Sequence, residues 1–180
     1  MTDDSRYDGA SRRPCASPPC YEAEIQPEVA PETRPVPMTL AELTEALNTL
    51  IEAERAGARG LIEMQPGCPE APLKQLMHQV ACDEGHFCAM LTGHVVRLGG
   101  TASAATGQFF EKLMARQSLA ERLALLDRGQ SAVVRMLEDM LPKVVDRELA
   151  DDLREMRDVH VQNIARCAAF SGTGRSDRQR

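Results

Sequence analysis

The chain has 180 residues but no Trp, and aromatic residues make up only 3% of it. So few aromatic side chains argue against a protein that stacks the bases of single-stranded nucleic acid. The formal net charge of −6 argues further against nucleic acid or an anionic membrane as the main partner. We therefore expect neither nucleic-acid nor membrane binding.

Long apolar runs are also missing: none approaches the ~18 residues that a membrane span needs. The N-terminus lacks the charged-then-apolar layout of a secretory signal, so we expect a cytoplasmic protein. The six Cys include no CxxC pair, which argues against a zinc ribbon or a thioredoxin motif. In a cytoplasmic chain they are expected as thiols rather than disulfides.

Two of these cysteines have alternative interpretations. Cys20 lies in a Pro18–Tyr21 segment that is either a short docking motif for a protein partner or a plain linker. Cys88 is either redox-active or a small buried apolar residue of a helix. The sequence leaves both pairs of alternatives open.

Composition divides the chain into three parts. Residues 1–37 hold seven of the eleven Pro, and four Arg against seven acidic residues give this segment a net charge of −3. It has too few apolar side chains to offset the entropy of ordering, so we expect a disordered leader. Residues 173–180 are small, polar and basic, which predicts a disordered tail. Residues 38–172 are then the one folded domain.

Helical periodicity with apolar spacings of three and four runs through this domain. Capping-box patterns at Thr39–Glu42 and Ser118–Glu121 predict two helix starts, and Pro72 and Asp146 lie near the other two. The connection over residues 99–117 is long and contains a possible short helix at 108–115. The pattern predicts an all-α fold, an antiparallel four-helix bundle with one crossover between its second and third long helices.

Each predicted helix carries a polar residue within its apolar stripe when it is projected at 100° per residue. A carboxylate there costs several kcal/mol unless it is paired, protonated or bound to a metal. Because these residues lie near the middles of their helices, an antiparallel bundle brings them into one layer. The converging residues are Glu54, Glu84, Gln130, His160 and Asn163.

Three other histidines suggest a metal-binding ladder that geometry excludes. His78, His86 and His94 recur every eight residues. Successive members lie ~12 Å apart along a helix and ~80° around it, so they cannot share one ion. His86 projects away from the apolar stripe and is expected near solvent, whereas His94 is expected as a structural residue of the core.

The pattern resembles that of the ferritin-like superfamily, which places Glu, ExxH, Glu and ExxH on four successive helices. Glu54, Glu84 and His160 match this pattern, whereas three positions depart from it: Phe87, Gln130 and Arg157. The amino-acid sequence resembles even more closely a bacterial ferritin-like family, one of the domains of unknown function. The similar segments are 18–24, 52–59, 83–91, 128–130 and 156–164, and the likeness covers nearly all of residues 38–170.

The resemblance implies an up-down-down-up bundle, and the three departures disfavour a complete di-iron site. The remaining set could hold one divalent ion (iron, manganese or zinc) with oxidoreductase-type activity. Glu54, Glu84 and His160 would then be ligands, with Gln130 and Asn163 as further ligands or supports; no catalytic residue is assigned. The alternative is a metal-free polar network in a non-enzymatic scaffold or binding module, which uses a homodimer face or the leader.

Overall fold

The computed structural model describes residues 35–173, with side chains as far as Phe170. Most of the expected leader, including Cys20 and the Pro18–Tyr21 segment, lies outside the described residues, as does the expected tail from residue 174. The predictions of disorder and docking in these segments stay predictions.

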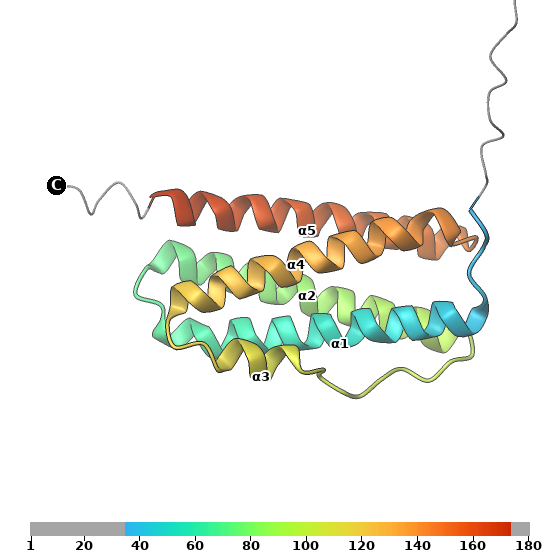
Figure 1. Cartoon of the computed structure of the whole chain (residues 1–180), viewed down its shortest axis with the longest axis horizontal. Coiled ribbons are helices and arrows are strands. Elements are labelled where there is room, and N and C mark those ends of the chain that lie inside the picture. The colour runs from blue at the N-terminus through green and yellow to red at the C-terminus, as the bar shows by residue number, and fades with distance from the viewer. Residues whose placement is uncertain (1–34, 174–180) are drawn as a thin grey trace, which may run out of the picture. The chain divides into compact units, whose positions relative to one another are not determined.

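The described chain is helical and contains no strand, which confirms the all-α prediction. Two antiparallel hairpins are joined by a crossover that runs back along the bundle, so that α2 and α4 are parallel (Figure 1). No described helix is long and apolar enough to cross a membrane. The helices are α1 (Leu40–Met64), α2 (Ala71–Arg97), α3 (Phe109–Met114), α4 (Leu119–Met140) and α5 (Arg147–Thr173), with 3₁₀ turns at Gln65–Gly67 and Leu141–Lys143.

Both predicted capping boxes are present. Thr39 accepts a hydrogen bond from the Glu42 backbone N–H at 3.3 Å, and the Glu42 carboxylate accepts one from the Thr39 backbone N–H at 2.8 Å. Ser118 and Glu121 make the same reciprocal pair at the start of α4. These bonds satisfy backbone donors that a helix start otherwise leaves unpaired, so the two starts follow from local sequence. Helix α5 continues through Thr173, one residue beyond the end expected for the folded domain.

The crossover is held against α1 by polar side chains of that helix. Asn48 binds both Thr101 and Ser103 of the crossover, and the Ser103 hydroxyl donates to the Glu52 carboxylate at 2.5 Å. Arg55 donates to the carbonyl of Ala105. Glu52 and Arg55 therefore face the crossover, which covers that side of α1.

Apolar side chains form two clusters in the bundle. Along each long helix, a mid-helix polar position separates the residues of one cluster from those of the other. The first cluster includes Leu47, Leu50, Phe87, Leu91, Leu137 and Leu153, and the second includes Leu61, Met64, Met77, Val80, Leu113 and Leu126.

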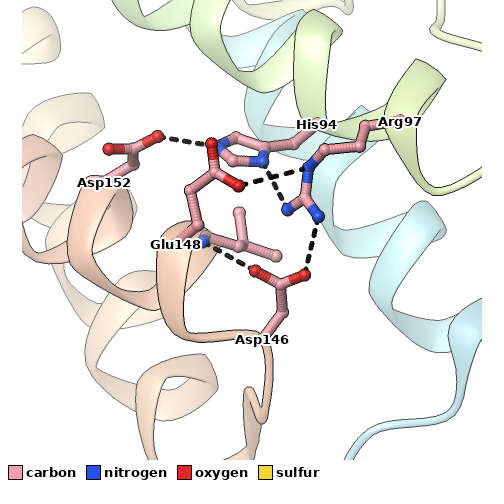
Figure 2. Close-up of polar contacts among 6 residues, drawn as sticks. His94, Arg97, Asp146, Glu148 and Asp152 are labelled. Atoms are coloured by element: carbon pink, nitrogen blue, oxygen red, sulfur yellow. Dashed lines mark hydrogen bonds and ion pairs between the residues drawn. The ribbon is translucent and has the colours of Figure 1, made fainter.

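Hydrogen bonds and ion pairs among polar side chains join the end of α2 to the start of α5 (Figure 2). His94 Nε2 lies 2.7 Å from the Asp152 carboxylate, while its Nδ1 lies 2.9 Å from Arg97 Nη2. Arg97 also contacts Asp146 at 2.8 Å and Glu148 at 3.8 Å. The sequence predicts a satisfied or partly exposed structural histidine here, and the structure shows the first of these, because His94 is only 6% exposed and both ring nitrogens have partners.

Candidate functional site

The five predicted polar residues are all buried in the bundle interior. None is more than 7% exposed, and they come from all four long helices. Their hydrogen bonds form two pairs across the bundle and one link to the edge of α2. The residues are Glu54 on α1, Glu84 on α2, Gln130 on α4, and His160 and Asn163 on α5.

His160 joins α5 to α1. Its Nδ1 lies 2.9 Å from the backbone carbonyl of Met156, and its Nε2 lies 3.1 Å from Glu54 Oε1. Because a carbonyl only accepts, Nδ1 carries a proton and donates it. Nε2 and Oε1 can therefore attract each other only through a shared proton, which either the Glu54 carboxyl group or a protonated imidazole supplies. A cation could also take the place of that proton.

Glu84 joins α2 to α4, where Gln130 Nε2 donates a short hydrogen bond to Glu84 Oε1. The Glu84 carboxyl group also lies directly against α1 at Gly57. A Cβ atom added at Gly57 would sit 2.3 Å from Glu84 Oε2, closer than real atoms pack. A glycine at this place on α1 is therefore what lets the carboxyl group occupy the core.

Four buried side-chain oxygens in this layer have no hydrogen-bond partner. Each of the four is a carboxylate or amide oxygen, which accepts hydrogen bonds and does not donate them. An unpartnered buried acceptor costs about 1–3 kcal/mol, so such a shell favours a cation, an acidic proton or water. The atoms are Glu54 Oε2, Glu84 Oε2, Gln130 Oε1 and Asn163 Oδ1.

Burial dominates the electrostatics of this layer. It raises the pKa of Glu54 despite the opposing hydrogen bond and charge of His160. It raises the pKa of Glu84 well above the usual range, and the negative charges of Glu54 and Asp83 raise it further. Burial lowers the pKa of His160, but the hydrogen bond and charge of Glu54 outweigh this effect, and the net shift is upward. Desolvation thus disfavours an empty, fully ionised pair of carboxylates.

A cavity of about 220 Å³ lies between α1 and α4, beside this layer. Glu54, Glu84 and Gln130 line its polar side. Thr49 and Ala132, which are exposed, also line it and mark where it meets the surface. Phe109 of α3 lines it as well; a Cβ atom added at Gly129 would sit 2.8 Å from that ring.

The positions that depart from the ferritin-like pattern have other partners. Phe87 is 3% exposed, and its ring centroid lies 5.7 Å from that of His160. Arg157 is turned to its neighbour Asp158, to which it donates at 2.7 Å. Among the described residues, no group of three or more His, Cys, Asp or Glu is arranged to hold a metal ion. The donor set therefore does not fit a two-metal centre.

Sequence reasoning missed two contributors to the site. Asp83 lies near the edge of the apolar stripe of α2 and accepts a 3.1 Å hydrogen bond from Asn163 of α5. Gly57 of α1 lies against the Glu84 carboxyl group of α2. Each role depends on a neighbouring helix, so neither is visible in the periodicity of one helix. Cys88 is partly buried and within 3.8 Å of the Ile51 carbonyl, a contact of the kind that a packed helix residue makes.

An antiparallel pair of helix hairpins, one crossover and a mid-bundle layer of Glu and His define a ferritin-like four-helix-bundle protein. A solved structure described as a dodecameric thioferritin, the bacterioferritin-related protein from Bacteroides fragilis, is similar with a TM-score of 0.64. It is 11% identical, and the match covers 79% of this chain and 94% of that one. The chain belongs to the family described as a domain of unknown function (DUF6306), whose model matches residues 41–169. No curated protein matches it.

Proposed function

We propose that the polar layer binds one divalent metal ion and gives this ferritin-like protein an oxidoreductase-type activity. Glu54, Glu84 and His160 would hold the ion, with Gln130 and Asn163 as further ligands or supports. The observation that carries the proposal is the set of unpartnered buried oxygens in the same layer as His160, whose Nε2 atom contacts Glu54. A cation is one of the few partners that can satisfy several such acceptors at once.

The setting of His160 supports a ligand role. Metal-binding histidines commonly donate their other ring N–H to a carbonyl or carboxylate, which orients the ring. Here the Met156 carbonyl occupies Nδ1, and Nε2 faces a carboxylate oxygen of Glu54. One imidazole and two carboxylates suit iron, manganese or zinc. When bound, such an ion would supply redox or Lewis-acid chemistry.

In this proposal, Gln130 and Phe87 support the residues that hold the ion. Gln130 holds the Glu84 carboxyl group in place through its amide N–H. Phe87 packs next to His160, and the two apolar clusters lie on either side of the layer. The homodimer that the sequence suggested also stays a proposal; the dodecameric assembly belongs to the description of the B. fragilis protein.

A metal-free network is the second candidate function. The Glu54–His160 and Glu84–Gln130 bonds pair part of the layer without any ion, and no three-ligand group is present among the residues described. In this case the bundle is a non-enzymatic scaffold or binding module.

Metal analysis separates the two candidates. Protein from medium supplemented with iron, manganese and zinc is purified, and metal per chain is measured for the wild type, Glu54→Ala and His160→Ala. We expect about one ion per wild-type chain and a loss in both variants, whereas His86→Gln, at an exposed histidine of α2, keeps the ion. A wild type without metal, whose thermal stability is unchanged by a chelator, overturns the proposal.

A further inference from the structure

The cavity between α1 and α4 has two chemically different sides. Its polar side is formed by Glu54, Glu84 and Gln130, each at least nine-tenths buried. The rest is mostly apolar and leads toward the surface at Thr49 and Ala132. The apolar side chains are Leu50, Phe109, Leu126, Val133 and Met136.

The polar side offers mainly acceptors. Glu54 Oε2, Glu84 Oε2 and Gln130 Oε1 are unpartnered, while one of the two Gln130 amide N–H groups is used by Glu84. A ligand that fits must therefore bring N–H or O–H donors. Two carboxyl groups line the cavity and no Lys or Arg does, so the site also disfavours an anionic ligand.

We propose that this cavity binds a small primary alkyl ammonium, with its three N–H donors at Glu84, Gln130 and Glu54 and its alkyl chain along the apolar wall. The ligand satisfies these oxygens and buries its chain, so both halves of the cavity are used. The Glu54–His160 hydrogen bond stays intact, because Oε1 makes that bond and Oε2 is the free atom. The proposal does not rest on metal binding and names a different ligand.

Size restricts the ligand further. At ~30 Å³ for each water molecule in the liquid, the cavity of about 220 Å³ has room for about seven waters. It is smaller than the pockets of roughly 300–1,000 Å³ that hold drug-sized ligands. A chain of about four carbons fits, whereas a branched or quaternary ammonium lacks either the room or the donors.

The test uses the full-length, chelator-treated protein and n-butylammonium chloride in isothermal titration calorimetry. We expect saturable one-to-one binding. n-Butanol, tetramethylammonium and butyrate should bind at least about tenfold more weakly, because each lacks the charge, the donors or the correct sign. Binding of n-butanol with equal affinity overturns the proposal, since the cavity would then select only an apolar chain.

Variants at the cavity mouth locate the binding. Ala132→Trp fills the exposed mouth on α4 and should weaken n-butylammonium binding at least about tenfold. Ala124→Trp is the matched control, since Ala124 is an exposed α4 residue that does not line the cavity. Equal affinity in both variants overturns the proposal. Ala132→Trp should keep the same metal content as the wild type, so the amine and metal proposals can fail separately.

Discussion

At the scale of single residues, Gly57 is the position where a missing side chain matters most. Its Cα faces the Glu84 carboxyl group so closely that an added Cβ would lie 2.3 Å from Oε2 and 2.7 Å from Cδ. Glu84 is 2% exposed and bonded to Gln130, so it has little freedom to withdraw. The geometry of the polar layer thus depends on a residue that contributes no functional group.

Gly57→Ala should lower the free energy of unfolding by about 1–3 kcal/mol, the usual cost of forcing an atom into a packed core. The cost should be much smaller in a Glu84→Ala background, where the clashing carboxyl group is gone. Urea denaturation of the wild type, both single variants and the double variant measures this coupling. Additive costs would show that the clash with Glu84 does not determine the role of Gly57.

At the scale of helices, the junction between α2 and α5 depends on Asp146. Its carboxylate accepts a 2.9 Å hydrogen bond from the Leu149 backbone N–H at the start of α5 and pairs with Arg97 of α2. These bonds lower the pKa of Asp146 from 3.8 to about 2. One carboxylate therefore caps one helix and ties it to the end of another.

The low pKa of Asp146 predicts how this junction responds to acid. Because the folded-state pKa is below the unfolded value of 3.8, the contribution is fully present above that pH and is lost as pH falls toward about 2. Asp146→Asn should therefore be less stable than the wild type at pH 6, and the difference should disappear near pH 2. Urea denaturation across this range provides the measurement. A difference that stays constant with pH would contradict the ionic role.

The sequence predicts features that a single helix determines, but not the contacts that depend on how the helices and the crossover pack. Capping boxes at Thr39 and Ser118 are local signals, and the structure has both helix starts where they predict them. The burial of Glu54 and His160 follows from periodicity, because the apolar neighbours on one helix determine its inward face. The contact of Arg55 with the carbonyl of Ala105 could not be predicted in this way, because Ala105 belongs to a crossover whose path no periodicity encodes. The cavity likewise arises from the spacing of α1 and α4, which neither helix specifies alone.

At the scale of the whole molecule, a polar layer interrupts the apolar residues of the bundle. A continuous apolar interior would bury the same helices without the desolvation cost of two carboxylates and an imidazole. Each long helix nevertheless carries at least one of the five buried polar residues, between its residues of the two apolar clusters. The layer lowers stability relative to an apolar interior, and this cost supports the proposal that the layer binds a ligand.

This explanation predicts the outcome of replacing the Glu54–His160 pair. In chelator-treated protein, His160→Leu alone should lower the free energy of unfolding by about 3–5 kcal/mol, because it leaves the buried Glu54 without its partner. The double variant Glu54→Met/His160→Leu should recover most of that loss, since two apolar side chains of similar size remove the unpaired charge. Urea denaturation measures both values, with Asp158→Asn on the exposed side of α5 as a control near the wild type. A double variant less stable than His160→Leu alone would mean that the pair itself holds the bundle together, and the layer would then not require a ligand to explain it.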